Sequence, residues 1–241
     1  MAALPNMLVF DPKYFLYVGP FMLLALWAQW RVKGTFSRFS QVGLRSGVSG
    51  ADVAALILRS SGLPDVRIEG VDGMLGDHYD PSSRTVRLSR DVLHGRSAAA
   101  VAVAAHECGH ALQHAQGYQP MLWRAGLVPV VNIVNSVAMP MFMIGMFMTP
   151  FRYLAIVGVV MFAVGTLFHL VTLPVEYDAS ARAVKILEHS GLADPQEMVG
   201  VRKVLFAAGF TYLAATLVAA AELLYWLLQS GLLGGSRSSE E

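Results

Sequence analysis

Long apolar runs alternate with polar segments along this chain, and four of the runs have the length of a membrane span. A helix needs about 20 predominantly apolar residues to cross the hydrocarbon core of a bilayer. The alternative, buried helices of a large soluble core, would require more charged surface than the sequence provides. The pattern therefore predicts four transmembrane helices, at residues 14–30, 127–148, 153–173 and 210–228.

The residues that flank these runs favour the same interpretation. Lys13 and Arg31 bound the first run, and tyrosine and tryptophan residues near its ends are typical of membrane interfaces. No small-residue cleavage site follows it, which favours an uncleaved anchor over a signal peptide. Only residues 149–152 separate the second run from the third, so these two are expected to form a tight hairpin.

The composition agrees with a membrane protein. Hydrophobic residues make up 55% of the chain, charged residues 15%, and the mean hydropathy is +0.50, whereas soluble domains contain about 25% charged residues. A net charge of +1 gives no indication of a nucleic-acid partner. The single cysteine, Cys108, cannot form an internal disulfide and suits a reducing compartment.

Basic residues are distributed unevenly between the two sides that the four runs define. Eleven of the eighteen lie between the first and second runs, from Arg31 to Arg124, and four more follow the third run. Because cytoplasmic loops carry the excess of lysine and arginine, both large loops are predicted to be cytoplasmic and both termini to lie outside.

The first large loop has the pattern of a small α/β unit. Ser49 and Asp52 have the spacing of a capping box before an amphipathic helix. Residues 66–71 and 85–89 alternate apolar with polar side chains, and turn residues lie between them. The pattern predicts a two-stranded hairpin with a long connection, in which the 84–88 strand offers an edge for an extended substrate.

The strongest chemical signal is the pattern H-E-x-x-H at residues 106–110. An alanine- and valine-rich run precedes it, with Ser97 placed to cap a helix and Gly117 placed to end it. On a helix, residues four apart share a face, so the two histidines can bind one metal ion beside the glutamate. In the alternative interpretation the histidines only pack or face water. The predicted roles are metal ligands for His106 and His110 and general base for Glu107.

Catalytic zinc usually has three protein ligands and a water molecule, so one ligand remains to be found. His114 repeats the four-residue step, but about 12 Å of helix rise separates it from the first histidine, which places it at the rim of the site instead. Glu176 directly follows the third run, on the predicted cytoplasmic side, and Pro174 suits a helix start or a kink. Glu176 is the predicted third ligand; alternatively, its carboxylate pairs with Arg182 or Lys185.

These motifs resemble, in order and over most of the chain, the YugP-type neutral zinc metallopeptidases of bacterial membranes. The likeness is carried by residues 77–81, 88–89, 106–115 and 173–180. A strand pair before H-E-x-x-H and a glutamate after a membrane hairpin are similar, more distantly, to HtpX-type membrane proteases. The resemblance implies a membrane-embedded zinc endopeptidase with a cytoplasmic active site. One catalytic Zn²⁺ would be held by His106, His110 and Glu176, with Glu107 as the catalytic residue.

One position departs from the HtpX-like pattern, which has an aspartate four residues after the ligand glutamate. Ser180 stands there in this chain, and the nearest acid is Asp178. Either group is a candidate for orienting a ligand histidine from outside the coordination shell. The candidates for the donor that stabilises the oxyanion of the transition state are His78, Tyr79, Tyr177 and Arg182.

The sequence thus predicts a mainly α-helical membrane protein with four transmembrane helices and a small cytoplasmic α/β zincin-like unit, a short hairpin plus the H-E-x-x-H helix. The predicted activity is that of a gluzincin-like metalloendopeptidase of the bacterial inner (plasma) membrane. It would cleave membrane-proximal or unfolded protein substrates with a zinc-activated water molecule and Glu107 as general base. A homo-oligomer or a membrane-protein partner is left open.

The predicted segments follow from the runs and motifs. They are the first transmembrane helix (1–31), the cytoplasmic α/β unit with the H-E-x-x-H helix (32–126), the transmembrane hairpin (127–174), a cytoplasmic helical segment with the third ligand (175–209), the fourth transmembrane helix (210–229) and a disordered tail (230–241).

Two other functions fit parts of the pattern. A non-catalytic zinc-binding membrane scaffold would need a closed site, usually with four protein ligands, and three are found. An intramembrane-cleaving metalloprotease would place H-E-x-x-H within a span, but the apolar run 98–105 is too short. His169 and Glu222 lie inside predicted spans, where interhelical hydrogen bonding explains them more simply than a functional role.

Overall fold

A computed structural model describes residues 11–73 and 76–231, and over these residues the chain is mainly helical with a three-stranded sheet. The chain separates into two compact units. Within the described residues, the helical unit comprises 11–27, 124–170 and 213–231, and the α/β unit comprises 28–123 and 171–212. Almost all of the tail predicted to be disordered, 230–241, lies outside the described residues.

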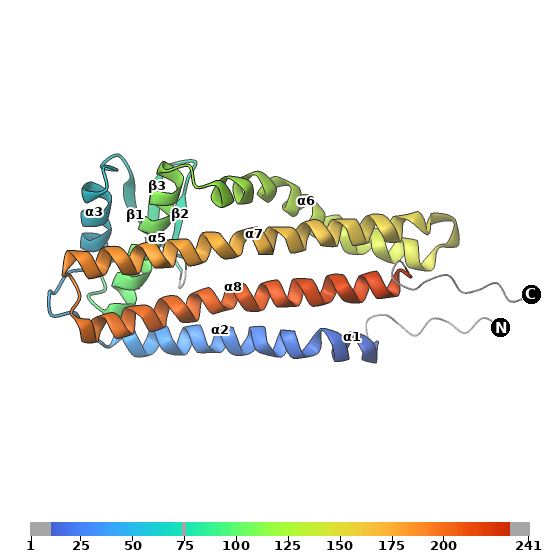
Figure 1. Cartoon of the computed structure of the whole chain (residues 1–241), viewed down its shortest axis with the longest axis horizontal. Helices are drawn as coiled ribbons and strands as arrows, with labels where there is room; N and C mark the ends of the chain where they lie inside the picture. The colour runs from blue at the N-terminus through green and yellow to red at the C-terminus, as the bar shows by residue number, and fades with distance from the viewer. Residues whose placement is uncertain (1–10, 74–75, 232–241) are drawn as a thin grey trace, which may run out of the picture. The chain divides into compact units, whose positions relative to one another are not determined.

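Three helices in the described part of the chain are long and apolar enough to cross a membrane: α6 (Gln119–Phe147), α7 (Tyr153–Ser190) and α8 (Pro195–Gln229) (Figure 1). They contain the third and fourth predicted runs and all of the second except Met148. The first predicted run, 14–30, is divided between α1 (Pro12–Tyr17) and α2 (Gly19–Ser40). The apolar part of α2 is shortened by Gln29, Arg31 and Lys33. This helix is therefore not among the three candidate membrane spans.

The hairpin of α6 and α7 is closed by a short 3-10 turn, η2 (Thr149–Phe151), as the four-residue gap predicted. Glycines let the two helices approach closely. A Cβ on Gly145 would lie 2.0 Å from the backbone nitrogen of Ala155, and one on Gly158 would lie 2.7 Å from the Cβ of Phe142. Large apolar side chains such as Ile133 and Val160 are exposed on these helices, as expected of a surface that faces lipid.

An interhelical hydrogen bond inside the helical unit involves Glu222. The carboxylate oxygen Oε1 accepts a hydrogen bond of 2.9 Å from the hydroxyl of Tyr14 on α1. A second interhelical bond, of 3.5 Å, runs from the hydroxyl of Thr216 to the backbone oxygen of His169. The hydrogen bonding predicted for Glu222 is therefore confirmed.

The α/β unit contains a sheet, three helices of its own and the adjoining parts of α2, α7 and α8. Its own elements are α3 (Gly50–Ser60), β1 (Arg67–Val71), β2 (His78–Asp80), β3 (Thr85–Ser89), α4 (Arg90–Leu93) and α5 (Ala98–Ala115). The predicted caps are present. Ser49 and Asp52 form the reciprocal capping box of α3, and the hydroxyl of Ser97 accepts a 3.2 Å bond from the amide of Ala100. Gly117 has a φ of +61° just after α5, a conformation that favours glycine.

The sheet differs from the predicted two-stranded hairpin. Its strand order is β1-β3-β2, with β1 and β3 parallel and β2 antiparallel to β3. The hairpin partner of β3 is β2. The turn between these two strands is shaped by the Asp80 carboxylate, which accepts hydrogen bonds from the amides of Ser82 and Ser83. The predicted edge at 84–88 is also wrong, because β3 is the central strand.

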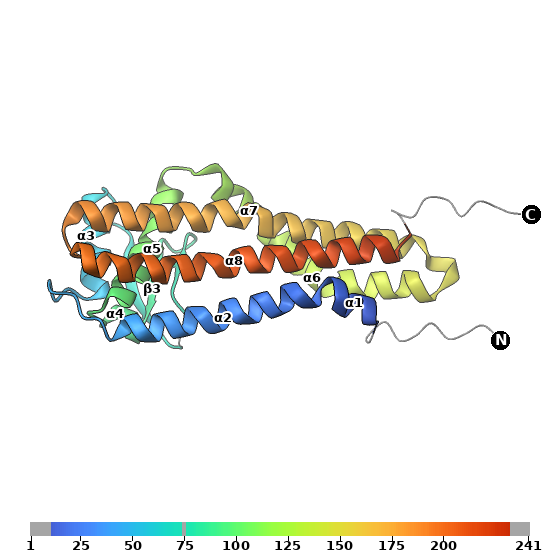
Figure 2. The same cartoon turned by 60° about the horizontal axis from the view of Figure 1, so that its bottom comes forward.

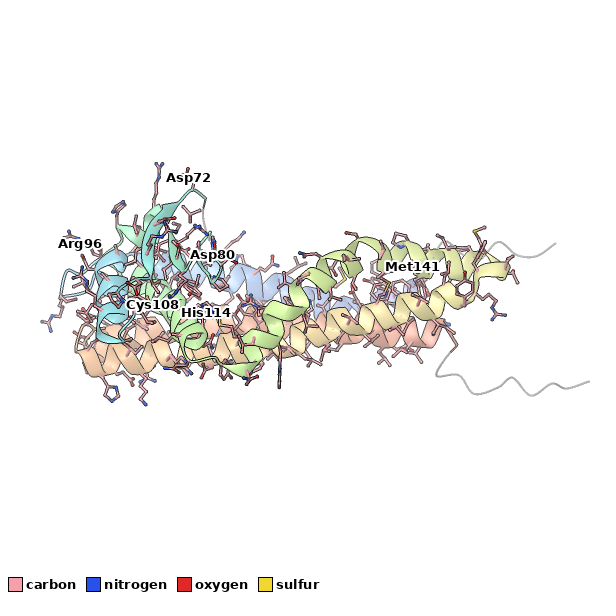
Figure 3. All side chains as sticks on the ribbon, turned by 90° about the horizontal axis from the view of Figure 1, so that it is seen from above. Asp72, Asp80, Arg96, Cys108, His114 and Met141 are labelled. Carbon is pink, nitrogen blue, oxygen red and sulfur yellow. The ribbon has the colours of Figure 1, made fainter. Side chains whose placement is uncertain are left out.

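The core of the α/β unit forms around α5, which carries the H-E-x-x-H pattern. Almost every residue of α5 from Ala98 to Gln113 is buried, including Cys108 (labelled in Figure 3). The buried side chains in this core include Ile57 of α3, Leu88 of β3 and Leu187 of α7. The small alanines of α5 allow these neighbours to approach its backbone, which holds the helix in a fixed orientation.

Candidate metal centre

Two imidazoles and one carboxylate converge in the α/β unit. His106 and His110 come from α5, and Glu176 comes from α7. The Nε2 atoms of His106 and His110 lie 3.2 Å and 3.5 Å from the same oxygen, Oε2 of Glu176. Within the described residues, these three side chains are a group of candidate ligands whose donor atoms all lie within 4.8 Å of one another. The structure thus brings together the predicted ligands from two distant parts of the chain.

A glycine inside the motif allows α5 and α7 to meet at this point. A Cβ on Gly109 would lie 2.6 Å from the backbone oxygen of Ala179, which is itself fully buried. Glu176 sits one turn before Ala179 on α7. Of the two alternatives for Pro174, a helix start or a kink, the helix start is wrong, because α7 runs through this residue from Tyr153 to Ser190.

The carboxylate of Glu176 is enclosed and held ionised. Only 1% of the residue is exposed. Burial by itself would raise its pKa, but the hydrogen bonds and charges of the two histidines outweigh burial and lower the pKa well below its usual range. For His110, burial would lower the pKa, yet Glu176, Glu107 and Gln113 together raise it above the ordinary value. The pair therefore favours a negative carboxylate beside a protonated imidazole when no metal is bound.

His110 is oriented by Gln113, a residue that the sequence interpretation missed. The Oε1 of Gln113 lies 3.0 Å from Nδ1 of His110, and its Nε2 donates to the backbone oxygen of Val175 at 2.7 Å and to Asp178 at 2.8 Å. An amide oxygen can only accept, so Nδ1 of His110 carries a proton. Two features of the sequence could have identified Gln113. It lies three residues after His110, on the same side of the helix, and it is a polar residue in an alanine-rich helix, where the structure buries it fully.

His106 is oriented from the opposite helix by Ser180. The hydroxyl of Ser180 lies 3.1 Å from Nδ1 of His106. The serine that replaces the aspartate of the HtpX-like pattern therefore contacts a predicted ligand, whereas Asp178 contacts Gln113. Each histidine has its Nδ1 engaged by a neighbour and its Nε2 directed at Glu176, the arrangement that supporting residues give metal-binding histidines.

Arg182 ties the supporting network to the end of α5. Its Nε donates to Asp178 at 2.5 Å, and its Nη1 donates to the Oε1 of Gln116 at 2.5 Å. The guanidinium also lies over the ring of Tyr118. The ion pair of Arg182 is thus with Asp178 and not with Glu176, and its guanidinium is already engaged by protein groups.

Glu107 has an available carboxylate next to the cluster. The residue is 7% exposed, and no described residue donates a hydrogen bond to it. Every fully buried side-chain nitrogen or oxygen among the described residues has a partner, so the carboxylate oxygens of Glu107 retain part of the small area that this buried residue exposes. An accessible carboxylate beside two imidazoles suits a general base.

The other candidate residues lie outside the cluster. His78 is exposed on β2 and contacts Arg87 and the backbone oxygen of Gly76. The Tyr79 hydroxyl and Nδ1 of His114 lie 2.8 Å apart, so these two side chains are hydrogen-bonded to each other (His114 is labelled in Figure 3). Tyr177 is 43% exposed on α7.

Residues 14–231 match the model of a family described as "Putative neutral zinc metallopeptidase". The chain belongs to this family. It is 45% identical over 205 residues, 85% of this chain and 91% of the relative, to the "Putative membrane protease YugP" of Bacillus subtilis (strain 168). Among solved structures, none matches.

Because the chain belongs to a zinc peptidase family, the distances between the donor atoms of the cluster are compared with those expected around zinc. Tetrahedral zinc with bonds of about 2.0–2.2 Å has neighbouring ligand atoms about 3.3–3.5 Å apart. The two distances from the histidine nitrogens to Glu176, 3.2 Å and 3.5 Å, are close to that value. Two imidazoles and a carboxylate are also a ligand set found in catalytic zinc sites. The cluster fits the ion that the family implies.

Proposed function

We propose that this protein is a membrane-embedded zinc-dependent endopeptidase that hydrolyses peptide bonds in membrane-proximal or unfolded proteins. His106, His110 and Glu176 would hold the ion, and Glu107 would be the general base. The observation that carries the proposal is the convergence of these three side chains, with the accessible carboxylate of Glu107 beside them. The printed name of the relative, a membrane protease, agrees with this activity.

Zinc in such a site supplies Lewis acidity, which lowers the pKa of a water molecule toward about 7 and polarises the scissile carbonyl. Glu107 accepts the proton that the attacking water loses and delivers it to the amine that leaves. Its carboxylate can do so because none of the residues that the structure describes donates a hydrogen bond to it. His106, His110 and Glu176 would hold the ion with three protein ligands, the number usual in catalytic zinc sites, whereas structural sites are usually closed by four.

The supporting residues keep the ligand nitrogens directed at one point. Gln113 fixes the ring of His110 and Ser180 contacts the ring of His106, so neither imidazole needs to reorient when zinc binds. The negative charge of Glu176 offsets part of the charge of the ion in a buried setting.

We further propose that the chain spans the bacterial plasma membrane four times, with both termini outside and the metal centre on the cytoplasmic side. Three long apolar helices and the excess of basic residues in the two large loops support this topology. The apolar residues of α1 and α2 would form the remaining span. The segment boundaries at 31, 126, 174, 209 and 229 then mark where the chain enters or leaves the bilayer.

The test compares the wild type with Glu107→Gln in zinc content and in cleavage of casein. We expect the variant to retain zinc and to lose at least about a thousandfold in cleavage rate. Glu69→Gln is the matched control, since Glu69 on β1 forms ion pairs at the surface with Arg67 and with Arg87 of β3. Full zinc content with no cleavage even by the wild type would favour the non-catalytic scaffold. Unchanged cleavage by Glu107→Gln would exclude this carboxylate as the base.

A further inference from the structure

A groove in the α/β unit, between α2 and α8, carries four cations. Arg31 and Arg38 of α2 and Arg202 and Lys203 of α8 line this space of about 610 Å³. Figure 1 shows the two helices next to each other here and Figure 2 shows them from another side, and a Cβ on Gly200 would lie 2.7 Å from the ring of Phe39. None of the groove's lining residues, all in the described part of the chain, is acidic.

Two of the four cations, Arg38 and Lys203, lie near the same aromatic ring, and a third has an acidic partner outside the groove. Arg202 forms an ion pair with Glu188, which lies outside the lining. The ammonium group of Lys203 lies 6.0 Å from the ring of Phe39, and the guanidinium of Arg38 lies 5.6 Å from the same ring. Aromatic rings attract these cations without neutralising them. The groove is therefore complementary to an anion.

The rest of the lining is apolar and exposed, which distinguishes this groove from a site for a small soluble anion. Trp30 is 74% exposed and Phe206 is 56% exposed. The guanidinium of Arg31 lies 5.5 Å from the ring of Phe206, so cation and apolar surface adjoin. An inorganic anion would leave both aromatic side chains in water, whereas a ligand with hydrocarbon chains would cover them.

The cations stand where each helix changes from polar to apolar sequence. On α2 they follow the apolar residues 21–28, and on α8 they precede the apolar residues 204–228. In the proposed membrane orientation, these are the levels at which a helix passes the lipid headgroups on the cytoplasmic side. Basic pockets between helices at that level are suited to acidic headgroups, and tryptophan is common there.

We propose that this groove binds the headgroup of an anionic phospholipid, with its phosphate among the four cations and its chains against Trp30 and Phe206. The inference rests on the membrane insertion in the proposed function but not on catalysis. Bound lipid would join α2 to α8, and α8 packs on the core that holds α5.

The experiment measures retention of phosphatidylglycerol by the delipidated full-length protein, using native mass spectrometry in detergent, with phosphatidylcholine as the neutral comparison. It uses a Glu107→Gln background, so loss of catalysis cannot alter the result. We expect preferential retention of phosphatidylglycerol and about a 25-fold weakening by Arg38→Gln with Lys203→Gln, about fivefold for each charge. The charge-preserving pair Arg38→Lys and Lys203→Arg should retain most of the binding.

The matched control is Arg59→Gln with Lys185→Gln, which removes two exposed cations from α3 and α7, away from the groove. Equal weakening in the control, or equal retention of both lipids, would overturn the proposal. Displacement of the lipid by inorganic phosphate at equal concentration would identify a phosphate site and overturn it too. A last outcome concerns the Arg38→Gln, Lys203→Gln variant with Glu107 restored. If this variant retained lipid normally but no longer cleaved acidic peptides, the groove would bind substrate and the proposal would be overturned.

Discussion

Gly109 lies so close to Ala179 that no side chain fits between them. A Cβ at position 109 would lie 2.6 Å from the backbone oxygen of Ala179 and 3.1 Å from its Cα. Gly109 precedes His110 directly, and Ala179 follows Glu176 by one helical turn. The approach of these two backbones therefore sets the distance between the histidine nitrogens and the glutamate oxygen.

Replacing Gly109 with alanine should force α5 and α7 apart and separate the ligands. We expect Gly109→Ala to lose most of its zinc and to lower stability by about 1–3 kcal/mol, because backbone atoms of Ala179 cannot move aside easily. Metal analysis and thermal unfolding would measure both effects. Gly126→Ala in α6 is the control, since no neighbouring atom of residues 11–73 and 76–231 lies within 4 Å of its Cβ position. Normal zinc binding by Gly109→Ala would show that the contact does not position the ligands.

Removing the buried amide of Gln113 should weaken zinc binding without touching a ligand. Gln113→Ala frees Nδ1 of His110 and leaves Asp178 and the oxygen of Val175 without this donor. We expect zinc affinity, measured by competition with a chelator, to fall about 10- to 100-fold. The exposed Gln119→Ala should have no effect. If affinity stays normal while zinc-free stability falls, the role of Gln113 is structural only.

Ser180 offers a test in which substitutions should act in opposite directions. Ser180→Ala removes the partner of His106 Nδ1 and should lower zinc affinity about tenfold or more. Ser180→Asp supplies the carboxylate of the HtpX-like pattern and should preserve or increase affinity. The same chelator competition measures both variants. Equal loss in the two would mean that position 180 does not orient His106.

Zinc affinity should rise with pH because His110 holds a proton in the metal-free protein. Burial opposes this proton, but Glu176 and Glu107 overcome burial and raise the pKa of His110. Below that raised pKa, zinc must displace the proton, so affinity should fall about tenfold per pH unit. Above it, His110 contributes no pH dependence. Glu176 adds none near neutrality, because its pKa is lowered and it stays ionised.

Glu107→Gln tests the cause of that pH dependence. It removes one of the carboxylates that raise the pKa of His110 and leaves the predicted ligands in place. We expect the pH at which affinity stops rising to move downward in this variant. A zinc affinity independent of pH in the wild type would contradict the raised pKa, and an unmoved profile in Glu107→Gln would remove the contribution of Glu107.

The sequence by itself determined the features that depend on local interactions. The capping of α3 and α5 needs only a side chain and the next turn of backbone, so Ser49 and Ser97 were sufficient signals. The shared face of His106 and His110 follows from helical spacing alone. Three long apolar helices follow from the length of uninterrupted apolar sequence, while the run that α1 and α2 divide is ambiguous because polar residues enter before α2 ends.

Tertiary structure decided everything that depends on which distant segments meet. Alternating strands at 67–71 and 85–89 could pair in either direction, and they are parallel because the chain reverses once into β2 and again into β3. Glu176 could have paired with Arg182 or Lys185 further along the same helix; the contact at Gly109 brings it to the imidazoles instead. Gln113 gained its role only when α7 supplied Val175 and Asp178. Such contacts depend on how helices pack, which residue spacing within one helix does not specify.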